Sequence, residues 1–260
     1  MIIDFHCHLG DRGVWADSPS MRVRKYDRFK VDKGVVLGGV YLEDWHEKRG
    51  SLRVSDFKAT NEATLKAVKE YPDRFIGFAW INPQQSDVLK DLDKYIGEYG
   101  FKGVGELIPY GWNFPNYSEP MIKMCERVER YKIPISAHTG PERWGNAAQF
   151  AALASEFPEV NFILAHMGWC DQEAIRQSVL AASRHKNLYL ETSSMPYPRM
   201  IRYAAEKIGY DRILFGSDTG SVGGNHLEYE IEKVRGARLS QKAEEFILGE
   251  NAARLLGLKP

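Results

Sequence analysis

Two histidines one residue apart end the first apolar run of the chain, which spans residues 2–8. Alternate side chains of a β-strand point to the same side, so His6 and His8 share one face while Cys7 lies on the other. Two imidazoles on one face form a pair of ligands for a divalent metal ion. Such an ion takes four or more ligands, and a catalytic ion keeps a position open. The rest of the chain should therefore supply the missing ligands.

Three further metal-type ligands stand at the ends of later apolar runs. His138, His166 and Asp218 each close a run of six or seven residues, and each is followed within two residues by glycine. Short runs of this kind, rich in β-branched and aromatic residues, are typical of buried strands. Four strands that each finish in a potential ligand predict one shared metal site.

The length and charge of the chain limit its class. Its 260 residues suit a single α/β domain of barrel size. Lys plus Arg and Asp plus Glu number 35 each, so the formal net charge is zero. A balanced charge gives no reason to expect nucleic acid or a membrane surface as a partner, and we expect a small-molecule substrate.

Cysteine usage and the first residues indicate a cytoplasmic protein. Cys7, Cys125 and Cys170 are odd in number and have no paired spacing, which argues against a disulfide framework and fits a reducing compartment. Acidic and histidine residues interrupt any apolar core of a signal peptide in the first run. The apolar runs are also far shorter than the roughly 20 residues that a membrane helix requires.

Strands and helices alternate along the whole sequence, which calls for parallel strands joined by helical crossovers. Strands are expected at 2–8, 34–40, 75–81, 103–108, 133–138, 160–166, 188–192 and 213–218. Helices are expected at about 61–71, 87–98, 146–156, 171–185, 228–235 and 240–256, after Ser118 and after Pro198. Eight such units predict a single (β/α)8 TIM barrel over residues 1–260, with the metal site at the C-terminal ends of the strands.

A doubly wound open sheet is the alternative fold. It is disfavoured because an open sheet spreads its strand ends along a crevice. Ligands from the first and the eighth strand meet only if those strands are neighbours, and closure of a barrel makes them so.

The polar segment 9–33, which carries seven Lys and Arg residues, is interpreted as a lid loop over the site. Its alternative is a solvated surface loop with some helix.

The residue types set the chemistry. Imidazoles with one carboxylate suit a borderline divalent ion, most simply Zn²⁺, with Mn²⁺ or Fe²⁺ as alternatives. We assign His6, His8, His138 and Asp218 as metal ligands, and Asp218 also as the group that takes a proton from a water molecule and returns it to a leaving group. His166 is expected to polarise the substrate or to transfer a proton. The result is hydrolysis of an amide, ester or lactone, or else decarboxylation on the same ligands.

These motifs resemble the amidohydrolase superfamily, and over the whole chain they are similar to its amidohydrolase-2 branch. The resemblance is carried by Asp4-Phe5-His6-Cys7-His8, His138, His166, Gly216-Ser217-Asp218, the run 61–83 and the tail 247–258. It implies a metal-dependent barrel from a group that includes hydrolases, lactonases and non-oxidative decarboxylases. In the mononuclear members of that branch, the residues matching His6, His8, His138 and Asp218 bind the metal, and the one matching His166 assists catalysis.

The fourth strand departs from that pattern. Many members of the superfamily carry there a lysine that can be carboxylated to bridge two metal ions, whereas this chain has Gly105-Glu106. Glu106 is either a bridging ligand, like the glutamate of the related TatD-type nucleases, or a carboxylate that hydrogen-bonds a ligand histidine or pairs with a basic neighbour. The sequence leaves one ion or two open.

Residues in the loops at the strand ends should set specificity. Arg143 is either a bidentate partner for a substrate carboxylate or a surface arginine. The other candidates for substrate binding are Trp15, Tyr110, Trp112, Trp169 and Ser193.

We predict a metal-dependent hydrolase of a small carboxylate-bearing amide, ester or lactone. A non-oxidative decarboxylase of an unsaturated or aromatic acid is the chief alternative, and a non-catalytic metal-binding scaffold is the third. The sequence does not determine the oligomeric state, including whether the protein forms a homo-oligomer.

Overall fold

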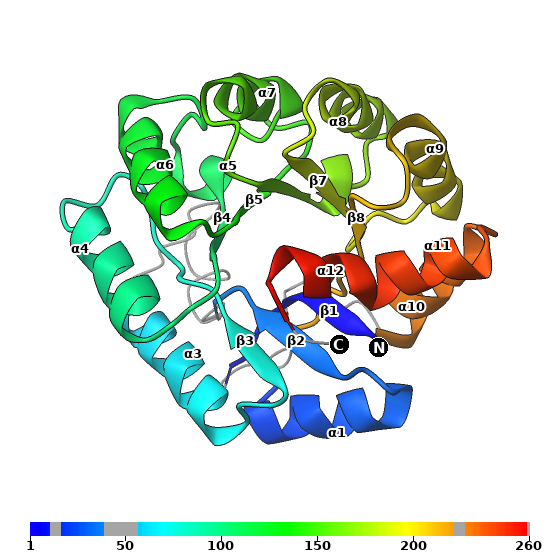
Figure 1. Cartoon of the computed structure of the whole chain (residues 1–260), viewed down its shortest axis with the longest axis horizontal. Helices are drawn as coiled ribbons and strands as arrows, with labels where there is room; N and C mark the ends of the chain where they lie inside the picture. Colours follow the sequence, from blue (N-terminus) through cyan, green and yellow to red (C-terminus); the bar gives the residue numbers. More distant parts are fainter. Residues whose placement is uncertain (11–16, 39–56, 221–226, 259–260) are drawn as a thin grey trace, which may run out of the picture.

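The computed structural model describes residues 1–10, 17–38, 57–220 and 227–258, and in this part of the chain strands and helices alternate around a central barrel (Figure 1). The strands are β1 (Ile3–Cys7), β2 (Lys33–Val36), β3 (Phe75–Gly77), β4 (Val104–Leu107), β5 (Ile135–His138), β6 (Phe162–Ala165), β7 (Leu188–Glu191) and β8 (Ile213–Leu214). Every pair is parallel, within the series β1-β2-β3 and β4-β5-β6-β7-β8. The predicted (β/α)8 class is confirmed.

Backbone hydrogen bonds close the two series into one ring. Between β3 and β4, Ala79 N donates to Gly103 O at 2.8 Å, and Gly105 N donates to Ala79 O at 2.9 Å. Between β1 and the residues after β8, His8 N donates to Thr219 O at 2.9 Å. Parallel bridges pair Ala79 with Val104 and Cys7 with Thr219. The first and last strands are therefore neighbours, as convergence of the predicted ligands requires.

Helices surround the strands in Figure 1. They are α1 (Pro19–Phe29), α3 (Phe57–Glu70), α4 (Val88–Leu92) continued by a π-helix at Asp93–Glu98, α5 (Pro109–Trp112), α6 (Glu119–Tyr131), α7 (Ala147–Glu156), α8 (Gln172–Arg184), α9 (Pro198–Ile208), α10 (Leu227–Gly236), α11 (Gln241–Glu245), a π-helix at Phe246–Glu250, and α12 (Asn251–Leu255). Asp171, where the sequence predicts a helix to begin, caps α8, since its side chain accepts the backbone N–H groups of Glu173 and Ala174. None of the helices in the described ranges is both long and apolar enough to cross a bilayer.

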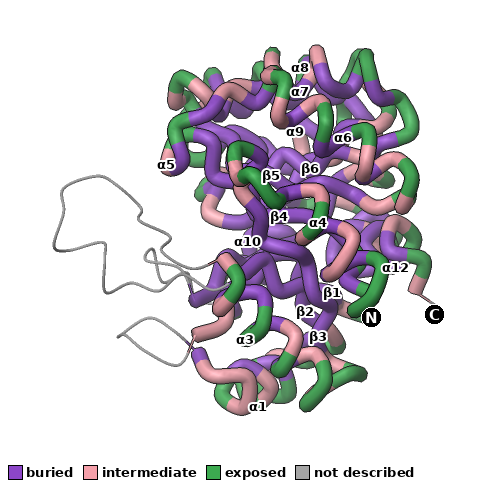
Figure 2. The backbone as a smooth tube through the Cα atoms, turned by 90° about the vertical axis from the view of Figure 1, so that its left-hand side faces the viewer, coloured by how far each residue is buried: buried purple, intermediate pink, exposed green. Residues whose placement is uncertain are grey.

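The barrel interior is filled with apolar side chains at its N-terminal end. Figure 2 shows the strands as buried backbone in the middle of the molecule. One core cluster joins strand residues to α12 and consists of Ile3, Phe5, Val35, Leu37, Ile76, Phe78, Ile163, Leu214, Ala252, Ala253 and Leu256. Because α12 covers this end of the barrel, the interior near the C-terminal strand ends is where polar chemistry can be placed.

A β-bulge in each of two strands changes the direction of side chains near the C-terminal end of the barrel. Between Asp4 and Cys7 the chain of β1 advances three residues while its partner β2 advances two, and β4 shows the same extra residue between Val104 and Leu107. A bulge changes which face later residues occupy. Phe5 can therefore belong to the interior core while His6, the next residue, also points inward.

The segment 9–33, predicted as a lid loop, contains the helix α1. Ser18 caps the helix and Lys30 ends it in a left-handed conformation. Arg22 and Tyr26, four residues apart, are the buried residues of α1, and the Arg22 guanidinium donates to Thr219 Oγ1. Much of this segment is therefore docked against the barrel. Residues 11–16 lie outside the described residues, so the lid role stays a prediction for the start of the segment.

Asp4 ties α1 to the junction of β1 and β8. It is fully buried, and its carboxylate accepts hydrogen bonds from Tyr26 Oη (2.9 Å), Ser217 N (2.8 Å), Ser217 Oγ (2.6 Å) and His6 N (3.2 Å). Burial raises the pKa of Asp4, although these hydrogen bonds and the charge of Arg22 oppose the rise. One side chain thus satisfies donors from three elements at the place where the ring closes.

Asp4→Ala should consequently destabilise the fold. Its removal leaves buried donors unsatisfied, which costs about 3 kcal/mol and should lower Tm by roughly 6 to 12 °C for a chain of this size. Thermal and urea unfolding would measure the change. Asp73→Ala, at an exposed aspartate, is the control and should stay within about 0.5 kcal/mol of the wild type. A similarly small effect of Asp4→Ala would contradict the prediction.

Candidate metal centre

Four imidazoles and two carboxylates meet at the C-terminal ends of the strands. They come from β1, β4 and β5 and from the residues that follow β1, β6 and β8. None is more than 8% exposed: His6, His8, Glu106, His138, His166 and Asp218. Groups of three among them have ligand atoms within 4.8 Å of one another, namely His6, His8 and Glu106, and Glu106, His138 and His166. The structure thus brings together every residue that the sequence suggested for the metal.

Glu106 occupies the middle of this cluster, and its two oxygens face different histidines. Oε2 lies 3.3 Å from His6 Nε2 and 3.7 Å from His8 Nε2. Oε1 lies 3.1 Å from His166 Nε2 and 3.4 Å from His138 Nδ1. One carboxylate therefore stands between two pairs of imidazoles, with one oxygen for each pair.

Asp218 lies on the side of the first pair. Its Oδ1 is 3.2 Å from His8 Nε2 and 3.6 Å from His6 Nε2. Its Oδ2 accepts a hydrogen bond of 2.6 Å from Ser194 Oγ, and its backbone N–H donates to His6 O at 2.7 Å. The carboxylate is thus oriented by a neighbouring strand end, while its backbone is held by β1.

Sharp turns after the strands bring these side chains over the barrel. His166 and Asp218 have left-handed φ angles of 63° and 52°, a conformation that costs non-glycine residues on the order of 1–3 kcal/mol. The glycines that follow allow the turn to continue. A Cβ on Gly220 would lie 2.2 Å from His8 O, and one on Gly168 would lie 2.5 Å from Ile175 N. The sequence pattern of ligand followed by glycine thus has a steric reason.

Glu191, at the end of β7, is a part of the site that the sequence did not reveal. It is fully buried, and its Oε2 lies 3.0 Å from His6 Nδ1 and accepts Ser193 Oγ–H at 2.8 Å. Its position at the end of a strand is the one signal that could have identified it, but no glycine follows. Ser193, predicted to bind substrate, is also fully buried and lies 2.9 Å from His166 Nδ1.

The second nitrogen of three imidazoles is already engaged. Nδ1 of His6 faces Glu191 Oε2 at 3.0 Å, Nδ1 of His8 faces Gly38 O at 3.4 Å, and Nδ1 of His166 faces Ser193 O at 3.2 Å. These oxygens can only accept, so we assign the proton of each neutral ring to Nδ1. Each Nε2 then presents a lone pair to the cluster, as metal-ligating histidines do.

The resulting set of donors fits a divalent cation. Nε2 of His6 and Nε2 of His8 are 3.1 Å apart, and both face Glu106 and Asp218. Lone pairs and carboxylate oxygens that converge in a buried space repel one another unless positive charge lies among them. Nitrogen and oxygen donors of this kind suit Zn²⁺, Mn²⁺ or Fe²⁺.

The pKa shifts point in the same direction. Burial lowers the pKa of His6, but Glu106 and Glu191 outweigh it and bring that pKa well above its usual value. Burial likewise opposes the rise at His138, where Glu106 and Glu142 bring the pKa to about 9. Burial raises the pKa of Glu106, yet the surrounding histidines take it well below its usual range. The cluster favours bound positive charge, for which protons and metal ions compete.

The cysteine between the two β1 histidines is not part of this cluster. Cys7 points outward, its Sγ lies 3.3 Å from Val35 O, and burial raises the pKa of its thiol to about 12. A thiol that stays protonated is a poor metal ligand. Cys7 therefore packs as a small apolar residue.

Two of the predicted substrate-binding aromatic residues lie against the histidines. The ring centroids of Tyr110 and Trp169 are 4.7 Å and 5.7 Å from that of His138. Both side chains are more than one-third exposed. Burial and the charges of Glu106, Glu142 and Asp218 raise the pKa of Tyr110, so its hydroxyl stays protonated. An aromatic surface thus adjoins the cluster where it approaches solvent.

The remaining predicted specificity residues lie elsewhere. Arg143 is exposed, and its guanidinium stacks 4.3 Å from the ring centroid of Trp144. Trp112 is buried beside Trp80, with ring centroids 5.6 Å apart. Trp15 lies outside the described residues. Binding of substrate by these side chains stays a prediction.

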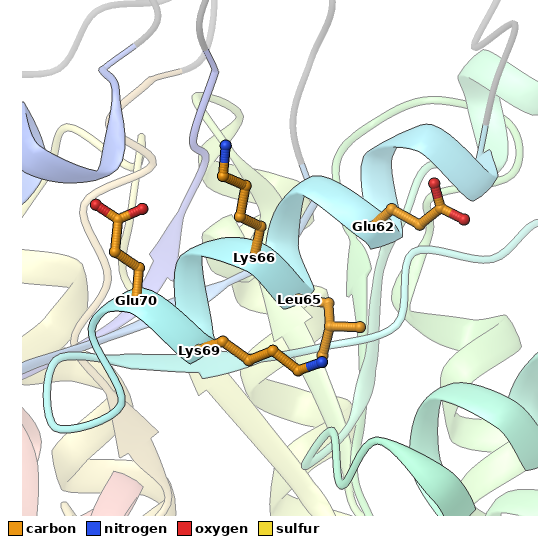
Figure 3. A pocket seen from close by; sticks show the side chains of 5 residues that line it. All are labelled: Glu62, Leu65, Lys66, Lys69 and Glu70. Carbon is orange, nitrogen blue, oxygen red and sulfur yellow. The ribbon is translucent and has the colours of Figure 1, made fainter.

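A hollow on the outer surface of the barrel does not belong to this centre. It lies along α3, as Figure 3 shows, and is lined by Glu62, Leu65, Lys66, Lys69 and Glu70. All five side chains come from one helix. It contains no histidine and none of the clustered carboxylates.

Comparison with known structures supports the fold. A TIM-barrel protein from Bordetella bronchiseptica is 19% identical, with 98% of both chains covered and a TM-score of 0.76. A dihydroxybenzoic acid decarboxylase from Polaromonas with bound manganese and the inhibitor 2-nitroresorcinol is 17% identical over 98% of this chain and 96% of that one, with a TM-score of 0.70. A probable 2-pyrone-4,6-dicarboxylic acid hydrolase from Acinetobacter baumannii with bound citric acid is 18% identical, with 99% of both chains covered and a TM-score of 0.71.

The sequence itself identifies the family. A search of curated proteins finds no match. The family described as Amidohydrolase (Amidohydro_2) matches residues 3–258, which is nearly the whole chain and includes all six clustered residues. Together with the barrel and its strand-end histidines, this match shows that the protein belongs to the Amidohydro_2 family of metal-dependent amidohydrolases.

Proposed function

We propose that this protein is a hydrolase that binds two divalent metal ions, most simply Zn²⁺, and directs water onto a small carboxylate-bearing amide, ester or lactone. The position of Glu106 carries the proposal. Each of its oxygens faces a separate pair of imidazoles, which is the arrangement expected of a carboxylate that bridges two ions. A residue that only oriented one ligand histidine would need one of those contacts.

Two donor sets follow from these contacts. The first consists of His6, His8, Asp218 Oδ1 and Glu106 Oε2, and the second of His138, His166 and Glu106 Oε1. The first set has the four donors of a tetrahedral site, whereas the second has three protein donors and leaves room for a further ligand. In this proposal His166 is a ligand, which leaves Asp218 as the group for proton transfer.

Ions bound there would acidify a water molecule and would act as Lewis acids on a substrate carbonyl. The chain supplies the proton transfer. Asp218 is ionised, because the neighbouring histidines hold its pKa below the usual range despite its burial, and it can accept a proton and return it to the leaving group. The hydrogen bond from Ser194 Oγ fixes one of its oxygens and leaves Oδ1 directed at the cluster.

Tyr110 and Trp169 support a small, flat substrate, since their rings adjoin His138 at the exposed edge of the centre. Arg143 is our candidate for the substrate carboxylate, because it is exposed and follows β5 closely. Hydrolysis of a lactone, an ester or an amide bond in such a molecule proceeds on the same donor sets.

Non-oxidative decarboxylation is the second candidate function. It is favoured by the likeness to the Polaromonas decarboxylase, whose structure contains manganese and a nitroresorcinol inhibitor. Aromatic rings beside His138 could hold an aromatic or unsaturated acid. Decarboxylation requires protonation at carbon and no attack by water, so a second ion would have no evident purpose in it.

Metal analysis together with product analysis tests both proposals. Elemental analysis of the purified protein should give two ions per chain, and a chelator should abolish activity that Zn²⁺ or Mn²⁺ then restores. A panel of lactones, esters, amides and unsaturated carboxylic acids should be assayed in ¹⁸O-labelled water. Hydrolysis places one labelled oxygen in the product. Release of carbon dioxide with no label in the organic product would overturn the proposal of a hydrolase. No turnover by a protein with both ions bound would indicate a metal-binding scaffold.

A further inference from the structure

The Glu191 carboxylate belongs to neither donor set, yet it contacts several residues of the centre. It is 0% exposed, and its Oε2 accepts hydrogen bonds from Ser193 Oγ at 2.8 Å and from the backbone N–H of His166 at 3.2 Å. The same oxygen lies 3.0 Å from His6 Nδ1, and Oε1 accepts the backbone N–H of Ser193. Each of these donors belongs to a ligand histidine or to the serine beside one.

These contacts form a chain between the two donor sets. His166 Nδ1 lies 2.9 Å from Ser193 Oγ, which in turn donates to Glu191 Oε2. His6 Nδ1–H donates to that same oxygen from the other side. The imidazole of His6 faces the first ion position and the imidazole of His166 faces the second, so one carboxylate oxygen orients a ligand of each.

We propose that Glu191 is a positioning residue that holds His6 and His166 in the Nδ1–H tautomer and thereby sets the affinity of both ion positions at once. The inference rests on the proposed function, because it takes the cluster to be a metal centre. Glu191 itself reaches neither ion in this scheme. It acts through hydrogen bonds to the far side of each ring, which fix the orientation of the ring and make its Nε2 more basic.

The amide of Glu191→Gln cannot reproduce this pattern. All donors around Glu191 point at its two oxygens, whereas an amide has one oxygen and one NH₂ group. If the NH₂ faces Ser193 N, a donor opposes a donor, and if it faces His6, the imidazole loses its acceptor. The variant also loses the negative charge that makes the ligand rings more basic. Loss of such a partner weakens metal binding about 10- to 100-fold.

The experiment titrates metal-free protein with Zn²⁺ against a chromophoric chelator and obtains both dissociation constants. Glu191→Gln should weaken both by about 10- to 100-fold. Ser193→Ala removes the side-chain link to His166 (2.9 Å) and a longer contact to His6 Nδ1 (3.4 Å). His6 keeps its direct contact with Glu191, so this variant should weaken the second ion position more than the first. Glu230→Gln is the matched control, since Glu230 is also buried and pairs with Lys233, which donates to Thr192 O beside Glu191. Its Zn²⁺ constants should equal those of the wild type.

Thermal unfolding of the metal-free proteins separates positioning from stability. A structural role alone would lower Tm in the absence of metal and leave the Zn²⁺ constants of the folded variant unchanged, and that result would overturn the inference. Equal weakening by Glu230→Gln, or weakening of only one site by Glu191→Gln, would also overturn it. A wild type that binds no Zn²⁺ would instead refute the proposed function, so the two failures are distinguishable.

Discussion

Glu106→Gln is expected to reduce the metal content from two ions per chain to one at most and to lower kcat by about 10³-fold. The reason is that both donor sets share this carboxylate, with Oε2 toward His6 and His8 and Oε1 toward His138 and His166. A neutral amide removes the charge that offsets two adjacent cations, and its nitrogen cannot act as a ligand. Elemental analysis and steady-state kinetics measure the two effects together.

Glu230→Gln serves as the control, because it removes another buried carboxylate, which pairs with Lys233 and, among the described residues, has no hydrogen bond or ion pair with the clustered imidazoles. We expect it to affect stability and to leave metal content and kcat near those of the wild type. Two ions retained by Glu106→Gln would show that the carboxylate is no bridge. One ion in the wild type would limit Glu106 to orienting the histidines and would favour decarboxylation.

Asp218→Asn should lower kcat about 10²- to 10⁴-fold, the usual contribution of a positioned acid or base, while the protein keeps at least one ion. His6, His8 and Glu106 remain as donors for the first ion, and the second donor set does not include Asp218. The asparagine can occupy the same space but cannot take up a proton. Metal content measured on the sample used for kinetics distinguishes a chemical effect from loss of metal.

Ser194→Ala is a milder change that affects the same carboxylate. It removes the hydrogen bond to Asp218 Oδ2 and keeps the carboxylate, so we expect a loss of about tenfold or less, in keeping with one hydrogen bond to a charged group. A fall in kcat with Asp218→Asn that is no larger than that of Ser194→Ala would assign proton transfer to another group. Complete loss of metal in Asp218→Asn would leave Asp218 as a ligand only.

The barrel was predictable because its strands are short, apolar and separated by helical patterns. The run that ends at His138 and the run that ends at His166 predict β5 and β6 to within two residues of their starts. The order of the ligands along the chain also required the first and last strands to be neighbours, and the hydrogen bond from His8 N to Thr219 O makes them so. Spacing and topology together were sufficient for this level of structure.

Other features depend on contacts that spacing does not encode. The bulges in β1 and β4 are visible only when each strand is aligned with its partner, yet they turn His6 and Glu106 inward. Five of the eleven residues of helix α1 are charged, and only Arg22 and Tyr26 are buried, so the composition of the segment favours a loop. Glu191 ends a strand like the ligands, but its role follows from hydrogen bonds across the barrel.

The closure of the barrel between β1 and the residues after β8 has a consequence for how the protein is made. Asp218 is translated more than two hundred residues after His6 and His8, beside which its carboxylate lies. A nascent chain therefore cannot assemble this set of donors until the residues that follow β8 have been translated. In the proposed centre, complete metal loading should therefore follow translation of β8, and chains that stop before it would lack one protein donor of the first ion position.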